Sequence, residues 1–422
     1  MTAPHALSWI LAFLRWLTPR RLQAQAIVLA LCLWGVAVVD FSTPGALDRA
    51  GNIKFHDFLP IYVAGRLVSQ DRALQLYDQK IAADERQSIL GESVNVRLPF
   101  LYSPQVALFF APIARLSFSA AARIWVALSL LIYYGCVYAV WRSCPSLQAH
   151  ARLVAISAVA FPPLFHFFVR GQLSALILLC ITVAYLAFRA EQSWLAGAAL
   201  GFLVFKPQFL VAIPLILLFA GAWKAFFGII ASATAQLVIT YFFFGAATMQ
   251  KYFDLFLHPS GWIDSAELSL APIQMHSLRS FFSLLIPWPS IALVFYGLSS
   301  VTILLLAVWI WRSSNALSIR FSALILAAVL INPHLFVYDL LVLAPALLLL
   351  TDATLNAEPE LDRSREVLQF LLYLAFVLPL IGPISRWTHV QLSVIVFVAI
   401  LWILHRTITA GHKFASAESA VV

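Results

Sequence analysis

The chain has 422 residues, of which 62% are hydrophobic and only 11% are charged, and its mean hydropathy is +0.90. A soluble domain has roughly a quarter of its residues charged, so most of this chain's surface must face lipid. The net charge of +8 comes mainly from Lys and Arg at the ends of hydrophobic runs, which indicates membrane topology and not a nucleic-acid interface. The four cysteines form no Cys-x-x-Cys pair, so neither a disulfide framework nor a zinc site is indicated.

The elements predicted in chain order are nearly all apolar helices. Residues 6–18 predict an interfacial amphipathic helix, since Arg15 interrupts the run and no small-residue cleavage site follows. Spanning helices need about 20 apolar residues. The twelve apolar runs lie near 22–40, 119–141, 152–169, 172–188, 193–205, 207–221, 225–245, 289–311, 318–332, 335–350, 367–383 and 388–405. Polar breaks between short runs, at Phe205-Lys206-Pro207 and Ile331-Asn332-Pro333-His334, predict tight turns at a membrane face.

Positive side chains in the short links predict the orientation. If the N-terminus is cytoplasmic, alternate links carry most of the Lys and Arg, which places both termini inside. We therefore expect one transmembrane domain over 1–422, with outer segments at 41–118 and 246–288 and a cytoplasmic loop at 351–366. Residues 101–115 would reverse every later link if they spanned, so we expect a re-entrant or juxtamembrane helix there.

The first outer segment carries the most suggestive acid. Asp57 comes directly before a predicted helix, FLPIYVAGRLVSQ, whose apolar positions recur every three or four residues. One interpretation makes Asp57 the N-cap of that helix, worth about 1 kcal/mol. The other makes it a general base at the boundary of water and lipid. The residues themselves favour neither.

Polar and basic groups recur at helix ends on the same predicted side. Each cation alone is expected to snorkel to the interface, but together, on the side that usually lacks positive charge, they predict an anionic ligand such as a phosphate. Asp339 lies about one turn beyond His334, so both are expected to face one cavity. The candidate binding residues are Arg170, Gln172, Lys206, His276, Arg279, His334 and Asp339.

Short motifs in a fixed order show that the chain resembles glycosyltransferase family 87, formerly a domain of unknown function. The matching motifs are Asp57-Phe58, Tyr62-Val63-Ala64, Leu76-Tyr77-Asp78, Tyr102-Ser103-Pro104, Ala107-Leu108, Pro112, Trp125, Gly171-Gln172, Ala196-Gly197, Lys206-Pro207-Gln208, Asn332-Pro333-His334 and Tyr338-Asp339. The chain has Ile61-Tyr62 where the family often has two tyrosines, and Ser103-Pro104 where it often has two prolines.

The resemblance implies an all-helical glycosyltransferase of the GT-C architecture, with juxtamembrane helices in the first outer loop. It implies that Asp57 is the general base and that His334 lies in the catalytic cavity. The implied donor is mannose, or another hexose or pentose, on a polyprenyl phosphate. The acceptor would be a lipid-linked or other glycan, and the product would form outside the cytoplasmic membrane by inversion. No cofactor or metal is expected, because the chain lacks a D-x-D pair.

Two rival functions use the same residues. A transporter or flippase for a lipid-linked anion would bind with these cations without chemistry, but it would usually show inverted repeats, and none is apparent. A membrane scaffold without catalysis is the other rival.

Overall fold

The computed structural model describes residues 3–91, 98–257, 272–356 and 362–419. The described residues form helices joined by short links, without a strand, and the only extended pairings among them are two isolated bridges, one of which joins Met275 to Phe336. Parts of the three predicted loops, at 92–97, 258–271 and 357–361, lie outside the described residues.

The helices follow one another in this order: α1 Ala3–Trp16, α2 Pro19–Phe41, α3 Leu59–Ser69, α4 Gln79–Leu90, α5 Pro104–Phe110, α6 Phe118–Trp141, α7 Pro145–Gln148, α8 Ala151–Ala160, α9 Pro162–Arg170, α10 Ser174–Arg189, α11 Ser193–Gly201, α12 Ile213–Phe219, α13 Trp223–Leu257, α15 Leu278–Leu285, α16 Pro289–Ser313, α17 Leu317–Ile331, α18 Leu343–Asn356, α19 Asp362–Val377, α20 Ser385–Thr388 and α21 Leu392–Ser419. The 3₁₀ segments are η1 His56–Phe58, η2 Ala73–Gln75, η3 Ile113–Arg115, η4 Phe202–Phe205, η5 Pro207–Leu210, η7 Val337–Val342 and η9 Leu378–Ile384.

The prediction of an all-helical membrane protein is confirmed. Among the described residues, seven helices are long and apolar enough to cross a membrane, and α8 with α9, bent by 44°, would make an eighth. The other four predicted runs are helical but shorter (Ser174–Arg189, Ser193–Phe205, Pro207–Phe219 and Leu317–Ile331). At 1.5 Å per residue they reach only about 20–24 Å, against a hydrocarbon core of about 30 Å. The sequence count of twelve therefore exceeds the number of helices with full spanning length.

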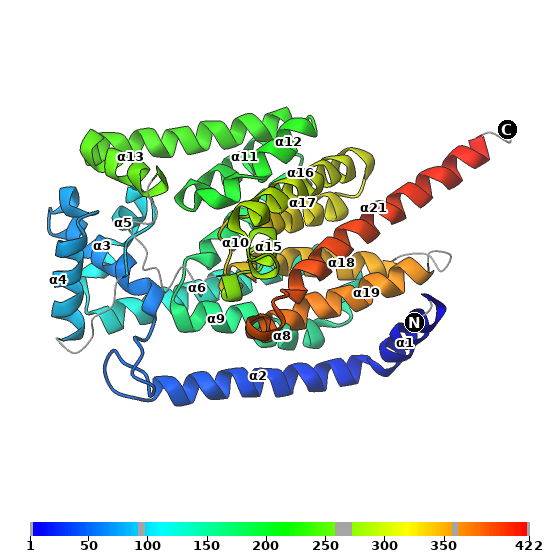
Figure 1. Cartoon of the computed structure of the whole chain (residues 1–422), viewed down its shortest axis with the longest axis horizontal. Helices are drawn as coiled ribbons and strands as arrows, with labels where there is room; N and C mark the ends of the chain where they lie inside the picture. The colour runs from blue at the N-terminus through cyan, green and yellow to red at the C-terminus, as the bar shows by residue number, and fades with distance from the viewer. Residues whose placement is uncertain (1–2, 92–97, 258–271, 357–361, 420–422) are drawn as a thin grey trace.

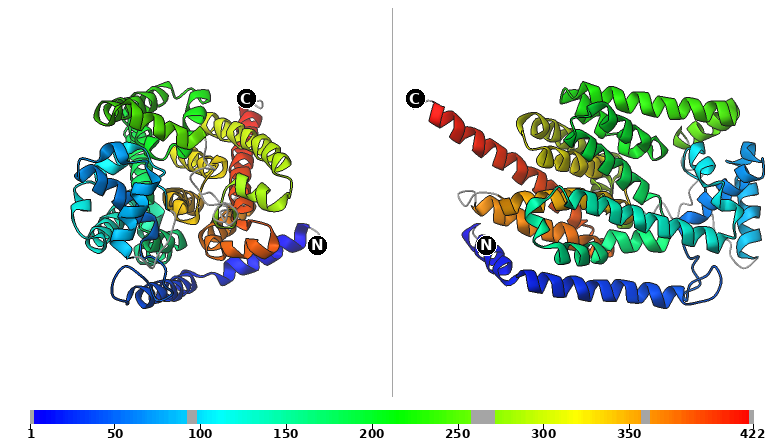
Figure 2. Two further views of the ribbon diagram at one scale, coloured as in Figure 1. Left: turned by 60° about the vertical axis from the view of Figure 1, so that its left-hand side comes forward. Right: turned by 180° about the vertical axis from the view of Figure 1, so that it is seen from behind.

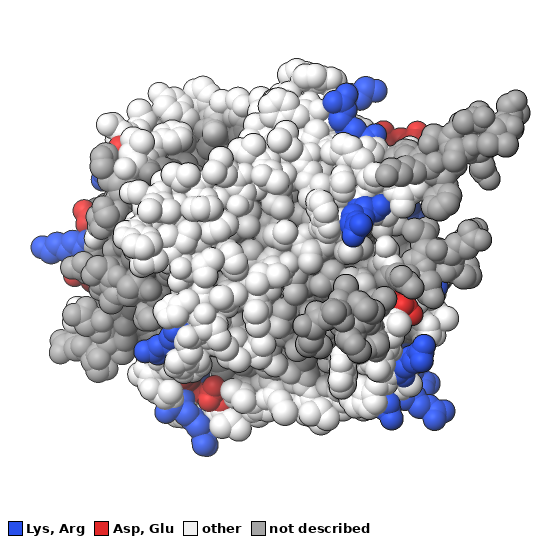
Figure 3. All heavy atoms as spheres, turned by 45° about the vertical axis from the view of Figure 1, so that its right-hand side comes forward, with Lys and Arg blue, Asp and Glu red and all other residues white. Residues whose placement is uncertain are grey.

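The bundle is elongated, and its two ends differ. Both termini lie at one end, whereas α3, α4 and α5 lie at the other (Figure 1). In a space-filling view, Lys and Arg lie toward the ends and a broad uncharged band separates them (Figure 3). A bilayer crossing this band would leave the charged groups at its two faces.

The buried centre of the bundle is formed by α17 and by η7 with α18. The window of Val337–Asn356 is 72% buried, against 17% for α2, α13 and α16, and two views show α18 enclosed by other helices (Figure 2). The outer helices expose large apolar side chains such as Phe242 and Leu31. Lipid must cover these side chains, because exposing so much apolar surface to water is unfavourable.

The stretch 101–115 forms α5, which has only seven residues, and the single turn η3. A helix of that length reaches about 10 Å and cannot cross a bilayer. It packs instead against α3. Gly65 allows this contact, because a Cβ there would lie 2.9 Å from the carbonyl carbon of Phe110.

Candidate active site

Asp57 lies in η1, directly before α3, and α3 lies at the end of the bundle away from the termini (Figure 1). The prediction that it is the N-cap of the next helix is wrong: the N-cap of α3 is Phe58, without a side-chain cap hydrogen bond. The Asp57 carboxylate instead contacts two side chains. Its Oδ1 lies 2.8 Å from His56 Nδ1, and its Oδ2 accepts a 2.6 Å hydrogen bond from Gln172 Nε2. The capping interpretation is therefore excluded.

The turn at the end of α9 brings Gln172 to Asp57. Gly171 has φ +69, and a Cβ there would lie 3.0 Å from Phe58 Cβ and 3.1 Å from Phe55 Cβ. A glycine is therefore required both for the left-handed conformation and for the close approach of η1. Trp125 Nε1 fixes the turn by donating to the Gly171 carbonyl at 3.0 Å.

Tyr102 orients the Gln172 amide. The Tyr102 hydroxyl donates to Gln172 Oε1 at 2.8 Å, so the amide nitrogen is turned toward Asp57. Sequence reasoning had Tyr102 only as part of a motif and not as a site residue. The signal that could have found it is the polar break Tyr102-Ser103 within an otherwise apolar stretch.

Arg170 forms an ion pair with Asp57. Its Nη1 lies 3.6 Å from Asp57 Oδ1, and its side chain is 35% exposed. Nη2 donates to Gln274 Oε1 at 3.2 Å, and the guanidinium carbon lies 5.9 Å from the centre of the Tyr338 ring. The contact with Asp57 is longer than a hydrogen bond. Arg170 is thus held loosely and can reach another anion.

Hydrogen bonds and charge decide the protonation state of Asp57. Burial by itself would raise its pKa, but the His56 hydrogen bond, the Arg170 charge and the Gln172 hydrogen bond together hold the pKa below the ordinary value of 3.8. Asp57 is therefore ionised at neutral pH, as a proton acceptor must be.

Lys206 and Asp339 form a second, fully buried cluster. Lys206 Nζ lies 2.5 Å from Asp339 Oδ1, and the Ser174 hydroxyl donates to the same oxygen at 2.8 Å. Lys206 lies at the predicted break, between η4 and η5, and its side chain is buried, with only 6% exposed. Its charge finds a carboxylate inside the protein instead of water, as a buried charge must. Lys206 is neutralised by Asp339 and is not a free cation.

Tyr338 lies between the two clusters. Its ring centre is 5.4 Å from Lys206 Nζ, and Arg170 lies near the same ring. Both clusters also act on Tyr102: burial and the negative charges of Asp339 and Asp57 raise the pKa of the Tyr102 hydroxyl well above 10.0. The structure therefore brings Asp57, Arg170, Gln172, Lys206 and Asp339 into one region.

His334 and Arg279 flank this region. Burial, with the neighbouring Lys206 charge, lowers the pKa of His334 to about 4, so its imidazole is neutral at pH 7. A neutral imidazole can still donate or accept a hydrogen bond, but it brings no positive charge to a ligand. Arg279 is exposed and donates to the Pro333 carbonyl at 3.4 Å.

His276 lies next to the segment that carries His334, because its backbone N–H donates to the Leu335 carbonyl at 3.0 Å. It is buried, its Nδ1 lies 2.7 Å from the Ser393 hydroxyl, and its ring packs against Gly382. These contacts tie the segment before α15 to α21. Within the described residues, no group of three or more His, Cys, Asp or Glu side chains could hold a metal ion.

No curated protein and no solved structure matches the chain. The family model for glycosyltransferase family 87 matches residues 100–337, which is more than half of the chain. The matched region contains Tyr102, Arg170, Gln172 and Lys206, all of which lie in the region described above. The chain therefore belongs to glycosyltransferase family 87 and is a membrane glycosyltransferase.

Proposed function

We propose that the protein transfers a sugar from a polyprenyl-phosphate donor to a lipid-linked or other glycan acceptor on the exoplasmic face of the bacterial cytoplasmic membrane, with both termini cytoplasmic. The sugar would be mannose or another hexose or pentose. The observation that supports this proposal is the pairing of an ionised Asp57 with a loosely held, half-exposed Arg170 at the end of a membrane-embedded bundle. Membership in a glycosyltransferase family favours sugar transfer over transport of a lipid-linked anion.

In the proposed reaction, the acceptor hydroxyl attacks the anomeric carbon while the bond from that carbon to the phosphate oxygen breaks. The configuration at the anomeric carbon is inverted, the hydroxyl proton passes to Asp57, and the electron pair of the broken bond stays on the polyprenyl phosphate. A phosphate is already a good leaving group, so the protein has only to stabilise its charge. Arg170 and Arg279 supply the positive charge that stabilises the phosphate, because Lys206 is paired with Asp339 and His334 is neutral.

Arg170 has two roles in this reaction. In the structure it faces the Asp57 carboxylate, and a donor phosphate would draw it away. Asp57 would then lose one of the interactions that hold its pKa low, and it would accept a proton more readily once the donor is bound. His56 and Gln172 would keep the carboxylate in place during the exchange.

The experiment is a transfer assay with purified protein in nanodiscs and a panel of radiolabelled polyprenyl-phosphate sugars. Wild type should transfer one of these sugars, and Asp57→Asn should lose at least about a hundredfold, the usual scale for a lost general base. Asp84→Asn is the matched control, because Asp84 is exposed on α4 in the same outer segment. Equal turnover of Asp57→Asn and wild type would exclude Asp57 from catalysis.

A further inference from the structure

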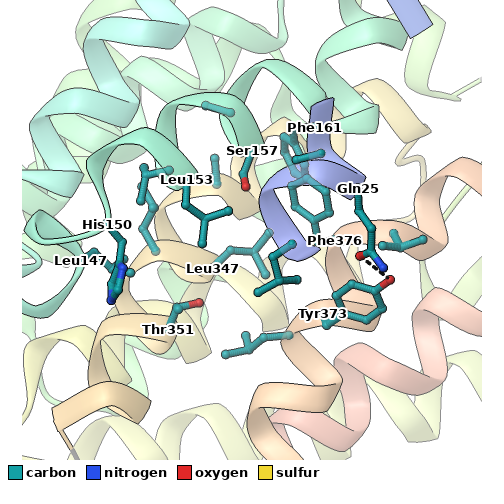
Figure 4. A pocket seen from close by; sticks show the side chains of 18 of the residues that line it. Gln25, Leu147, His150, Leu153, Ser157, Phe161, Leu347, Thr351, Tyr373 and Phe376 are labelled. Carbon is teal, nitrogen blue, oxygen red and sulfur yellow. Dashed lines mark hydrogen bonds between the residues drawn. The ribbon is translucent and has the colours of Figure 1, made fainter. Parts of the chain in front are cut away.

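A cavity of about 600 Å³ lies in the half of the bundle away from Asp57 (Figure 4). Its walls come from the first half of α2, from α6 and α8, from the whole length of α18 and from α19, and the end of α1 contributes Leu14. Asp57 follows the far end of α2, which is 23 residues long. The cavity is therefore a separate feature, and the proposed sugar transfer does not use it.

The walls of this cavity are mainly aliphatic and aromatic. Leu153, Leu347 and Phe376 are among the side chains drawn around it in Figure 4. Two of its polar groups satisfy each other, since Tyr373 and Gln25 form a 3.3 Å hydrogen bond. Water is not stable in a largely apolar space that offers few polar partners. A volume of this size is in the range of small-molecule sites, so an apolar chain from the surrounding bilayer can fill it.

Arginines adjoin the lining residues on two sides. Arg20 and Arg21 lie between the lining residues Pro19 and Leu22, and Arg152 lies between the lining residues His150 and Leu153. All three arginines are exposed. The nearby carboxylate of Asp352 accepts from the backbone of α7 and from Asn356, so it is engaged elsewhere. An apolar cavity flanked by cations is complementary to a lipid with an anionic head group.

We propose that this cavity is a binding site for one anionic bilayer phospholipid, with an acyl chain inside and the phosphate near Arg20, Arg21 and Arg152. Charge complementarity favours an anionic lipid over a zwitterionic one. The proposal does not depend on the activity at Asp57, because the two regions share no residue.

Native mass spectrometry of the purified full chain tests this proposal. The probes are phosphatidylglycerol, phosphatidylcholine and polyprenyl phosphate, each added to delipidated protein at equal concentration. We expect one phosphatidylglycerol to be retained at least about tenfold more tightly than phosphatidylcholine. Equal retention of phosphatidylglycerol and phosphatidylcholine would overturn the proposal. Polyprenyl phosphate carries the proposed donor, so it should bind near Asp57 and stay bound when the cavity is filled, and its loss from the filled cavity would also contradict the proposal.

Two kinds of variant locate the bound lipid. Ser157→Phe places a ring in the cavity and should abolish retention. The triple variant Arg20→Gln, Arg21→Gln, Arg152→Gln leaves the cavity open and should reduce retention of phosphatidylglycerol to the level of phosphatidylcholine, so it decides the question even if the filled variant misfolds. Lys224→Gln with Arg312→Gln is the matched control, because these exposed residues lie on α13 and α16, which do not line the cavity. Loss of the lipid in this control, or its retention in the triple variant, contradicts the proposal.

Discussion

At the residue scale, the surroundings of each charge determine what it can do. Arg170 and Lys206 are both cations at helix ends in the sequence, but only Arg170 remains loosely held and half-exposed. Lys206 is buried against Asp339 and Ser174. Burial with a carboxylate cancels its charge toward a ligand. Sequence position could not distinguish the two, because their partners come from elements far away in the chain.

The pH dependence of kcat/KM should report the ionisation of Asp57 in the free enzyme. Asp57 must be ionised to act, so activity is lost as the pH falls through its folded-state pKa, which is held below 3.8. Arg170→Gln removes a positive charge, so the pKa should rise and the acid limb of kcat/KM should move to higher pH.

The wild-type enzyme provides a second comparison. If the donor draws Arg170 away, the acid limb of wild-type kcat, which reports the substrate complex, should lie at higher pH than that of kcat/KM. Arg170→Gln should remove this difference. If the acid limbs of kcat and kcat/KM lie at the same pH in wild type, Arg170 does not move from Asp57 to the donor phosphate. Thermal unfolding at each pH is needed as a control, because a carboxyl with a lowered pKa also loses its stabilising effect as the pH falls.

At the element scale, glycines allow two helices to approach closely. Gly197 and Gly201 lie four residues apart on α11 and face α13, where a Cβ on Gly197 would lie 2.0 Å from the Ala225 carbonyl oxygen. Small residues at this spacing are typical of membrane helix interfaces. Because α11 is too short to span alone, this contact holds it in the bundle.

Gly197→Ala should therefore destabilise the protein by roughly 1–3 kcal/mol, as overpacking usually does. Gly135→Ala is the matched control, because a Cβ at Gly135 on α6 would meet nothing within 4 Å. It should be neutral or slightly stabilising, since alanine is the better helix former. The measurement is the thermal midpoint in detergent. Equal midpoints for the two variants would show that α11 and α13 separate without cost.

At the scale of the whole molecule, the two ends of the bundle should face opposite sides of the membrane. Asp84 lies on α4 at the end away from the termini, and Lys224 lies near the start of α13 at the other end. Positive residues favour the cytoplasmic side. We therefore predict that Lys224 and both termini lie inside the cell and that Asp84 lies outside.

Single cysteines in a background without Cys32, Cys136, Cys144 and Cys180 test this orientation. A membrane-impermeant maleimide should label Asp84→Cys in intact cells, and it should label Lys224→Cys only after the membrane is opened. Labelling of Lys224→Cys alone from outside would show the opposite orientation, and labelling of both positions from outside would contradict a separation of the two ends by the membrane.

The sequence by itself determined that the chain is a helical membrane protein, because hydrophobicity is a local property of each segment. A segment inside lipid must be apolar, and it must be helical to satisfy its own backbone hydrogen bonds. The sequence also singled out Asp57 through an ordered set of motifs and Arg170 as a cation at a helix end on the side that usually lacks positive charge. Only the tertiary structure decided that Asp57 is not a helix cap, that Lys206 is neutralised by Asp339, that the His276 side chain bonds to Ser393 of α21, and that four apolar runs are too short to span. These outcomes depend on contacts between residues more than a hundred positions apart, and on burial, which no local pattern contains.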